Sequence, residues 1–351
     1  MVCATNLGPE GGSPLNNPTQ LGYRMPAEWE PHVGTWLTWP RAEGISFPGT
    51  YNRIPPVLAK MIRALATGEK VFINVWDDAM EEEVRTHLET HEALSCNVEF
   101  YHHQAYEPWC RDHGPIFVKS KSKRAVINWG YNAWGEKYPP YDLEDRIPEH
   151  IARIRGINCI DGGMILEGGS IEVNGAGTLL TTESCLLNPN RNPELSRYQI
   201  EERLNQMLGA SDIIWLRGGI LGDDTDGHID NLTRFIDTET ILTAVEEDPQ
   251  EANYESLRSN LEQLRRTNLK IIGLPMPGPI TFQGERLPAS YANFYIGNSV
   301  VLLPTYQHPN DEKAADLLGQ AFPEREIVAI DSTDLVWGQG SFHCLTQQEP
   351  A

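Results

Sequence analysis

One cysteine near the C-terminus occurs in a setting that suits a nucleophile. Cys344 follows two glycines, Gly338 and Gly340, and precedes the polar run Thr346-Gln347-Gln348. Glycines let the backbone approach another group closely, and a thiol at a backbone bend can face a cleft. A buried, inert cysteine in a last strand is the commoner role of an isolated thiol. The groups that surround Cys344 therefore decide between these two interpretations.

Three carboxylates and an imidazole occur beside glycines in segments that are otherwise apolar. Asp112 precedes a Gly-Pro turn, and Glu167 lies between an apolar run and two glycines. A carboxylate in such a place is costly unless it is paired or functional. His228 and Asp230 are two residues apart, so on a strand their side chains would share one face. The structural alternatives are a surface Arg–Asp turn for the first segment and an edge-strand bulge for the second.

A metal site is not favoured by these spacings. The acidic stretch 222–231 resembles a Ca²⁺ loop, but no glutamate occupies the twelfth loop position and histidine is a poor ligand for a hard ion. The six cysteines are scattered without a Cys-x-x-Cys pair, and His228 lacks the spacing of a zinc site. We therefore expect no metal and no cofactor.

A thiol, an imidazole and three carboxylates together indicate attack on a cationic carbon. A Cys/His pair alone suggests nucleophilic catalysis with many substrates. Carboxylates hold a planar guanidinium through paired hydrogen bonds, and they would repel a carboxylate or phosphate substrate. The predicted chemistry is attack on the carbon of a guanidinium or amidine, and the expected partner is a small cationic guanidino compound.

The overall charge excludes some classes of protein. The 351 residues include 28 Lys and Arg against 49 Asp and Glu, a formal net charge of −21, so few basic groups could neutralise nucleic-acid phosphates. No apolar run approaches the ~20 residues that span a bilayer, and the N-terminus lacks the basic and apolar segments of a secretory signal. We expect a cytoplasmic protein with reduced thiols that binds neither nucleic acid nor membrane.

Alternating strand-like and helical segments predict an α/β fold over residues 21–351, after a flexible N-terminal lead of residues 1–20. The predicted strands are 71–75, 96–101, 213–216 and 270–274, and the predicted helices are 79–90, 147–155, 195–208 and 250–266, the last being the longest. Further strand-like runs adjoin glycine or polar turns at 32–40, 111–118, 167–173, 226–235, 293–304 and 338–345. Their recurrence suggests internal repetition, including a ring-like architecture.

In this order and spacing, the motifs resemble those of the agmatine deiminase family, which includes the bacterial peptidyl-arginine-deiminase-like proteins. The resemblance runs over nearly the whole chain, through the segments 22–39, 109–115, 167–169, 181–193, 226–231, 290–296 and 343–348. It implies a single catalytic domain, a five-bladed α/β propeller of ββαβ-type units with the active site at its centre. It also implies a homodimer.

The resemblance carries over roles residue by residue. It implies that Cys344 is the nucleophile of a covalent thiouronium mechanism without a cofactor, and that His228 is the general acid and base. Asp112 and Asp230 would clamp the guanidinium, and Glu167 would hold the substrate or orient His228. The residues implied to line the substrate slot are Trp109, the Trp36/Trp39 region and Gly340. An aromatic face in such a slot favours a cation.

Two departures from the family pattern leave the tail of the substrate open. Cys110 and His113 occupy positions where the family usually has Met and Thr or Ser, and the approach to Cys344 also differs. The leading expectation is hydrolysis of agmatine to N-carbamoylputrescine and ammonia, within putrescine biosynthesis. The lack of a signal and of a further C-terminal domain favours it over deimination of arginine or C-terminal peptidyl arginine to citrulline. An amidinotransferase and a non-catalytic binding platform are the remaining alternatives.

Overall fold

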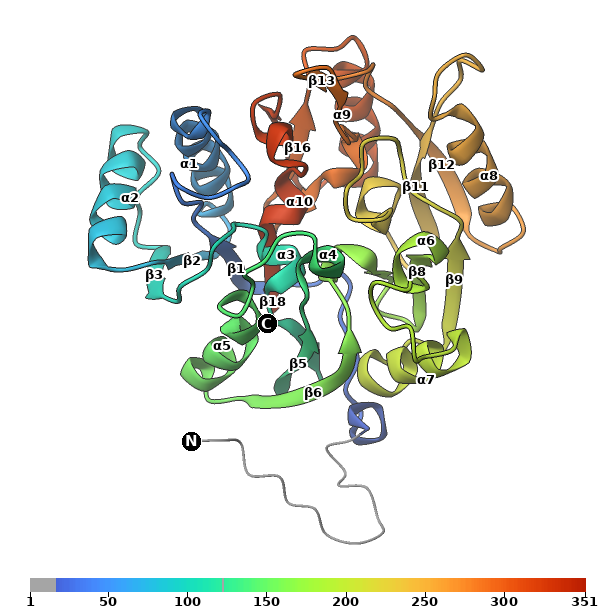
Figure 1. Ribbon diagram of the computed structural model, residues 1–351, viewed down its shortest axis with the longest axis horizontal. Coiled ribbons are helices and arrows are strands. Elements are labelled where there is room, and N and C mark those ends of the chain that lie inside the picture. Colours follow the sequence, from blue (N-terminus) through green and yellow to red (C-terminus); the bar gives the residue numbers. More distant parts are fainter. Residues whose placement is uncertain (1–16, 122) are drawn as a thin grey trace, which may run out of the picture.

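A computed structural model describes residues 17–121 and 123–351. The chain forms an α/β fold of several small sheets with helices around them (Figure 1), which confirms the predicted class. Of the predicted N-terminal lead, residues 1–16 lie outside the described residues. The 3₁₀ helix η2 (Pro18–Leu21) packs on a later helix, because the Thr19 hydroxyl donates to the carbonyl oxygen of Asn205 at 2.8 Å.

The helices and strands have the following bounds. The α-helices are α1 (Ile54–Leu65), α2 (Asp78–Thr90), α3 (Cys110–His113), α4 (Ala133–Glu136), α5 (Ile147–Arg155), α6 (Glu183–Leu186), α7 (Arg197–Leu208), α8 (Tyr254–Leu264), α9 (Asn310–Ala321) and α10 (Phe342–Leu345). The further 3₁₀ helices are η3 (Tyr51–Arg53), η4 (Glu144–Arg146), η5 (Gly168–Ser170), η6 (Ile229–Asn231), η7 (Tyr291–Asn293) and η8 (Leu335–Gly338). The strands are β1 (His32–Thr38), β2 (Lys70–Val75), β3 (Val98–His102), β4 (Ile116–Lys119), β5 (Arg124–Gly130), β6 (Asn158–Ile165), β7 (Glu172–Val173), β8 (Thr178–Thr182), β9 (Asp212–Leu216), β10 (Thr233–Phe235), β11 (Thr240–Val245), β12 (Lys270–Pro275), β13 (Thr281–Phe282), β14 (Glu285–Arg286), β15 (Tyr295–Ile296), β16 (Val300–Thr305), β17 (Glu326–Asp331) and β18 (Thr346–Pro350).

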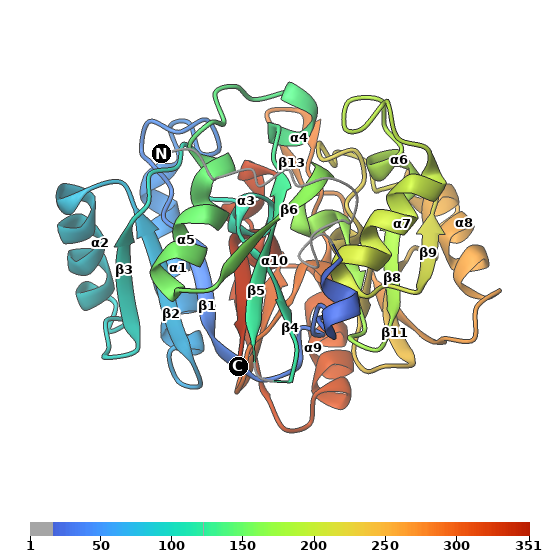
Figure 2. The ribbon, with the colours of Figure 1, turned by 90° about the horizontal axis from the view of Figure 1, so that it is seen from below.

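One pairing pattern recurs in the larger sheets of the described chain. An antiparallel pair is followed by a parallel strand in β4-β5-β6, β7-β8-β9, β10-β11-β12 and β15-β16-β17. A parallel strand requires a crossover, and a helix supplies it in each case, α5, α7, α8 and α9 in turn. These helices, together with α1 and α2, lie on the outside of the molecule, while α3 and α10 lie near its middle (Figures 1 and 2).

The sheet β18-β1-β2-β3 repeats this pattern by joining the two ends of the chain. Its antiparallel pair consists of the last strand and the first, with Trp36 opposite Gln347, and β1 pairs in parallel with β2. This pairing fixes the position of Cys344, because that residue comes immediately before β18.

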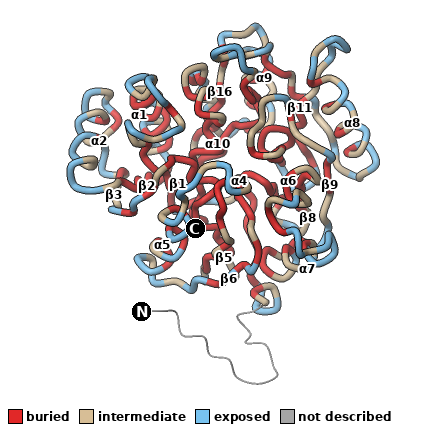
Figure 3. The backbone as a smooth tube through the Cα atoms, in the orientation of Figure 1, coloured by how far each residue is buried: buried red, intermediate tan, exposed pale blue. Residues whose placement is uncertain are grey.

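The buried part of the molecule is built from strands and from one face of each outer helix. In α1, the buried residues Leu58, Met61, Ile62 and Leu65 recur at helical spacing and pack on the core. Figure 3 shows the outward faces of the outer helices as exposed and the middle of the molecule as buried. Polar side chains that converge in that middle are therefore removed from bulk water.

Most of the predicted elements are confirmed. The predictions match α2, α5, β2, β9 and β12 within a residue or two, and α7 and β3 begin two residues later than expected. The helix predicted at 250–266 is shorter, Tyr254–Leu264, and the 13 residues of α2 exceed it. Helices α1 and α9 were not predicted.

One predicted strand is wrong, and another begins later than expected. The segment 338–345 starts at the last residue of η8 and contains helix α10, so strand β18 begins only at Thr346, and of the run predicted at 226–235 only β10 (Thr233–Phe235) is a strand. His228 and Asp230 lie at the start of η6 instead of on a strand, because Asp226 and Gly227 adopt positive φ of 68° and 98° and turn the chain there. The shared strand face inferred for His228 and Asp230 is therefore not the reason that they come together.

Candidate functional site

Each of the five predicted catalytic residues lies in or next to a short helical turn just before the first strand of a sheet. Asp112 is on α3 before β4, Glu167 precedes η5 and β7, and Asp230 is on η6 before β10. Cys344 is on α10 before β18, and η7 before β15 supplies Asn293. These turns also contact one another in a closed order, α3 to η5, η6, η7, α10 and back to α3. The same local arrangement is thus repeated around the middle of the molecule, and each turn places its own side chain near a common point.

That common point lies at Gly169. A Cβ atom placed on Gly169 would be 2.5 Å from His228 Nδ1, 2.8 Å from Asp112 Oδ1 and 3.1 Å from Asp230 Oδ2. Real Cβ atoms essentially never approach other atoms this closely, so only glycine fits there. The imidazole and two of the three acids therefore face one small volume.

The Cys344 thiol lies beside the same acids. Its sulfur is 3.5 Å from Asp230 Oδ2 and accepts a hydrogen bond from Asn293 Nδ2 at 3.1 Å. Burial raises the pKa of the Cys344 thiol well above its ordinary value, and the negative charges of Asp230 and Asp112 raise it further. A cation placed between the sulfur and these acids would offset that effect and favour the reactive thiolate.

The surroundings of His228 favour the protonated form of its imidazole, which can donate a proton. Its side chain is fully buried, and Nδ1 is 3.7 Å from Asp112 Oδ1. Burial alone would lower the pKa of His228, but Asp112, the neighbouring Cys185 and Glu167 together hold this pKa well above its ordinary value. The imidazolium form is thereby favoured near neutral pH.

The two aspartates differ in their environment. Asp112 accepts hydrogen bonds of 3.0 Å from the Gly169 amide and the Trp134 indole, and burial raises its pKa to about 6 although His228 opposes the shift. Burial also acts to raise the pKa of Asp230, but the hydrogen bond and charge of His343, 2.8 Å away, lower it below its ordinary value. Asp230 is therefore a charged acceptor over a wider pH range than Asp112.

Two buried carboxylate oxygens in the site lack a hydrogen-bond partner among the described residues. Glu167 accepts from Arg191 Nε at 2.6 Å through Oε1, which leaves Oε2 unpartnered. Asp230 Oδ1 is also unpartnered. Buried polar groups are nearly always satisfied, so each such atom requires an explanation. A guanidinium, with five N–H donors, would satisfy both oxygens.

Cys344 and Asp112 line a cavity of about 230 Å³. Three indole rings, of Trp109, Trp134 and Trp337, form part of its wall. Among the described residues, those that line the cavity include the acids Glu107, Asp112 and Asp224 but no Lys, Arg or His. Such a wall favours a slender organic cation over an anion.

Of the predicted lining residues, the structure brings Trp109 and Gly340 to the cavity. A Cβ atom on Gly340 would lie 2.5 Å from the Trp109 ring and 3.0 Å from Cys344 Cβ. Gly340 thus permits a close approach of the Trp109 indole to the backbone just before the nucleophile.

The prediction for Trp36 is wrong, and Trp39 does not line the cavity either. Trp36 is fully buried, with ring centroids 4.8 Å from Phe72 and 5.0 Å from Tyr101, and its indole donates to Glu349. Trp39 donates to the Tyr51 hydroxyl in a core cluster. Strand β1 is covered on both faces, so an aromatic residue on it packs in the core. The indoles that replace these two in the cavity are those of Trp134 and Trp337.

The sequence analysis also missed the groups that hold the site in place. Glu28 accepts from His343 Nε2 at 2.9 Å and from Arg234 at 2.8 Å, while His343 Nδ1 contacts Asp230 at 2.8 Å. Asn293 Oδ1 accepts from the backbone amide of His343 at 3.1 Å. Glu28 lies in the first segment that resembles the family, and His343 directly precedes the nucleophile. Their positions in these motifs could therefore have indicated a role in the site.

Comparison with known proteins places these residues among enzymes with a shared fold. The family model described as Porphyromonas-type peptidyl-arginine deiminase matches residues 24–350. The agmatine deiminase of Pseudomonas syringae pv. tomato is 35% identical over 96% of this chain and 98% of its own length. The solved agmatine deiminase of Enterococcus faecalis has a TM-score of 0.89 and 29% identity, covering 95% of this chain and 98% of that one. For the C. jejuni agmatine deiminase with substrate bound, the TM-score is 0.87 and the identity 31%, covering 94% and 96%.

Proposed function

The chain belongs to the family of Porphyromonas-type peptidyl-arginine deiminases, and from this premise we propose that it is an agmatine deiminase, a hydrolase of amidine C–N bonds. The reaction converts agmatine and water to N-carbamoylputrescine and ammonia. The composition of the cavity wall supports agmatine as the substrate, because the described residues that line it include acids and indoles but no basic side chain. Agmatine bears a cation at both ends, whereas arginine and C-terminal peptidyl arginine bring a carboxylate.

The mechanism begins with alignment of the substrate. Asp112, Asp230 and Glu167 bind the guanidinium N–H groups and hold the central carbon before the sulfur of Cys344. The positive charge of the substrate favours the thiolate, which attacks that carbon and forms a tetrahedral adduct. The electron pair of the breaking C–N bond leaves with nitrogen, and His228 protonates it to release ammonia.

The second half of the reaction removes the substrate from the enzyme. The product of the first half is a thiouronium joined to Cys344 through a C–S bond. His228, now neutral, takes a proton from water, whose oxygen attacks the same carbon. The C–S bond breaks, the sulfur regains its electron pair, and N-carbamoylputrescine is released. No metal or cofactor enters this scheme.

We propose that the fold is a five-bladed α/β propeller formed by residues 21–351 as one catalytic domain. The repeated strand pattern and the closed order of contacts between the five inner turns support this arrangement. The pairing of β18 with β1 would close the ring, as the last blade combines both ends of the chain.

The physiological setting is also part of the proposal. The reaction fits putrescine formation in the cytoplasm, carried out by a homodimer. Among residues 17–121 and 123–351, no helix combines the length and apolar character needed to cross a bilayer.

The substrate prediction is tested by ammonia release from three compounds. We expect kcat/KM for agmatine to exceed that for arginine and for a C-terminal arginyl peptide by about 100-fold or more, because a carboxylate beside buried acids is repelled. Equal or better turnover of arginine or the peptide would overturn the choice of agmatine. If an added amine receives the amidino group and an amidinated amine is formed, the enzyme is an amidinotransferase.

The pKa of Asp112 predicts a pH dependence. Protonated Asp112 no longer offers a charged acceptor, so kcat/KM for agmatine should fall as pH decreases through about 6. The Trp134 indole lowers this pKa, so Trp134→Phe should move the acid limb to higher pH. The matched control is Trp337→Phe, which changes a cavity indole without a hydrogen bond to Asp112. An acid limb that stays in place or moves to lower pH in Trp134→Phe would contradict this assignment.

The close approach at Gly169 predicts a loss of turnover from a single methyl group. In Gly169→Ala the new Cβ must displace the His228 ring or the Asp112 carboxylate, and such a displacement costs about 100-fold in kcat. Gly218→Ala is the control, because its Cβ would meet Ser184 at an ordinary 3.6 Å. Steady-state kinetics of both variants check the prediction, and normal turnover in Gly169→Ala would show that these groups do not act together.

A further inference from the structure

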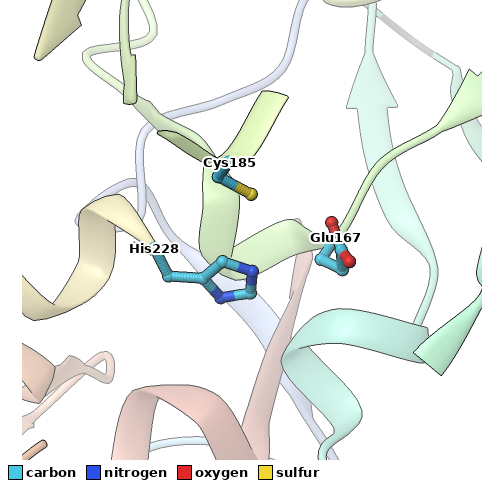
Figure 4. Close-up of side chains that lie close together, drawn as sticks. All are labelled: Glu167, Cys185 and His228. Atoms are coloured by element: carbon cyan, nitrogen blue, oxygen red, sulfur yellow. The ribbon is translucent and has the colours of Figure 1, made fainter. Parts of the chain in front are cut away.

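Cys185 is a buried thiol that the proposed mechanism does not use. It lies on helix α6 and is fully buried next to His228 and Glu167. In Figure 4 the sulfur of Cys185 lies above the imidazole ring and the carboxylate of Glu167 lies to its right, so that both face the same edge of the ring. A thiol, an imidazole and a carboxylate therefore surround one small space.

The donor atoms of these side chains are close together and largely unpartnered. One atom from each of Glu167, Cys185 and His228 lies within 4.8 Å of the others, and all three side chains are fully buried. Among the described residues, both ring nitrogens of His228 and Glu167 Oε2 have no hydrogen-bond partner. Buried, unpartnered donor atoms that face one another are what a metal ion satisfies.

We propose that Glu167, Cys185 and His228 form an inhibitory binding site for a thiophilic divalent cation such as Zn²⁺. Sulfur, imidazole nitrogen and carboxylate oxygen are the donors that Zn²⁺ prefers, and three protein ligands with an open fourth position are common. Mg²⁺ prefers oxygen ligands, so this donor set discriminates against it.

The local charges are compatible with such an ion. Glu167 binds Arg191 through Oε1 only, which leaves Oε2 for the ion. On binding, the ion displaces the protons of the Cys185 thiol and of the His228 imidazolium, and the resulting thiolate and the carboxylate of Glu167 together balance a charge of two. Zn–ligand bonds of roughly 2.0–2.3 Å bring donor atoms closer together than 4.8 Å, so small movements of the side chains complete the site on binding.

Asp112 lies between the cavity and this site. Asp112 lines the cavity, and its Oδ1 is 3.7 Å from His228 Nδ1. We expect a cation attracted by the acids of the cavity to reach Asp112, next to His228, and to enter the site when the His228 ring moves. Once bound, it holds the imidazole of His228 as a neutral ligand, which removes the proton that His228 delivers to the leaving nitrogen and stops turnover. This inhibitory effect depends on the proposed function, whereas metal binding itself does not.

Binding is tested without catalysis in a Cys344→Ser background that also carries Cys96→Ser and Cys159→Ser. Titration with Cd²⁺ should give a thiolate charge-transfer absorption that saturates at about one equivalent, and calorimetry with Zn²⁺ should give the same stoichiometry. Adding Cys185→Ala should remove the absorption and weaken binding by about tenfold or more. Cys110→Ala, which removes another buried thiol, is the matched control and should leave both signals. Cys185→Ser serves if the alanine variant does not fold, as judged by circular dichroism.

Inhibition is tested in the protein without substitutions and in the single variant Cys185→Ser. For each, the rate of ammonia release with Zn²⁺ is divided by the rate without it. We expect Zn²⁺ to suppress ammonia release from agmatine and Mg²⁺ to have no such effect. The variant Cys185→Ser should need a Zn²⁺ concentration at least about tenfold higher for the same degree of inhibition. Binding or inhibition that is equally strong without the Cys185 thiol would overturn the proposal. Binding that depends on Cys185 without any inhibition would uphold the site and contradict the role given to His228.

Discussion

Replacement of Cys344 by serine will lower kcat for ammonia release from agmatine by about 10⁴-fold or more. The hydroxyl can keep the contacts that the thiol makes with Asn293 and Asp230, so the fold and the cavity should persist. A serine hydroxyl between these acids does not ionise near neutral pH, and the nucleophile is lost. The measurement is steady-state ammonia release, together with agmatine binding by calorimetry, which should remain.

The matched control for this variant is Cys96→Ser. Cys96 is an exposed thiol outside the cavity, so its replacement should leave kcat unchanged. Turnover by Cys344→Ser at a rate near that of Cys96→Ser would show that another group attacks the substrate.

The second large effect is expected from His228→Gln. Glutamine retains a polar side chain but cannot deliver a proton to departing ammonia or accept one from water. General acid and base catalysis supplies up to about 10⁴-fold, so we expect kcat to fall by about 10³-fold with a much smaller change in KM. Burst and steady-state assays of ammonia release check both halves of the reaction.

His103→Gln is the control for this variant. His103 is also buried, but its ring packs beside Trp36 and contacts Asn74, away from the cavity. A loss of activity in His103→Gln equal to that in His228→Gln would attribute the effect to stability. A change confined to KM in His228→Gln would contradict its role in proton transfer.

The five proposed catalytic residues could be predicted because each is locally unusual. Asp112, Glu167 and Asp230 are charged residues beside glycines and apolar strands, and the structure brings them together with His228 and Cys344. Their meeting depends on a repeated turn before a strand, which leaves a recognisable local composition. The sequence did not predict that these turns are helical, because hydrogen bonds from distant residues, such as that between Asn293 and His343, fix them.

The supporting residues could not be predicted from local pattern. Glu28 and His343 are 315 positions apart, and their contact depends on the pairing of the first and last strands. The error at Trp36 has a related cause, since only the tertiary structure shows that β1 is buried on both faces. Long-range packing, not local propensity, decided both cases.

The central claim is that the Cys344 sulfur attacks a planar cationic carbon, and labelling with a haloacetamidine tests it most directly. This reagent carries an amidinium beside an alkylating carbon, so the acids that hold a guanidinium should guide it to the sulfur. The account predicts about one label per chain, located at Cys344 by peptide mass mapping, with activity lost in proportion and with protection by agmatine. Loss of activity with the label on another residue, or full labelling of Cys344 with activity retained, would contradict it.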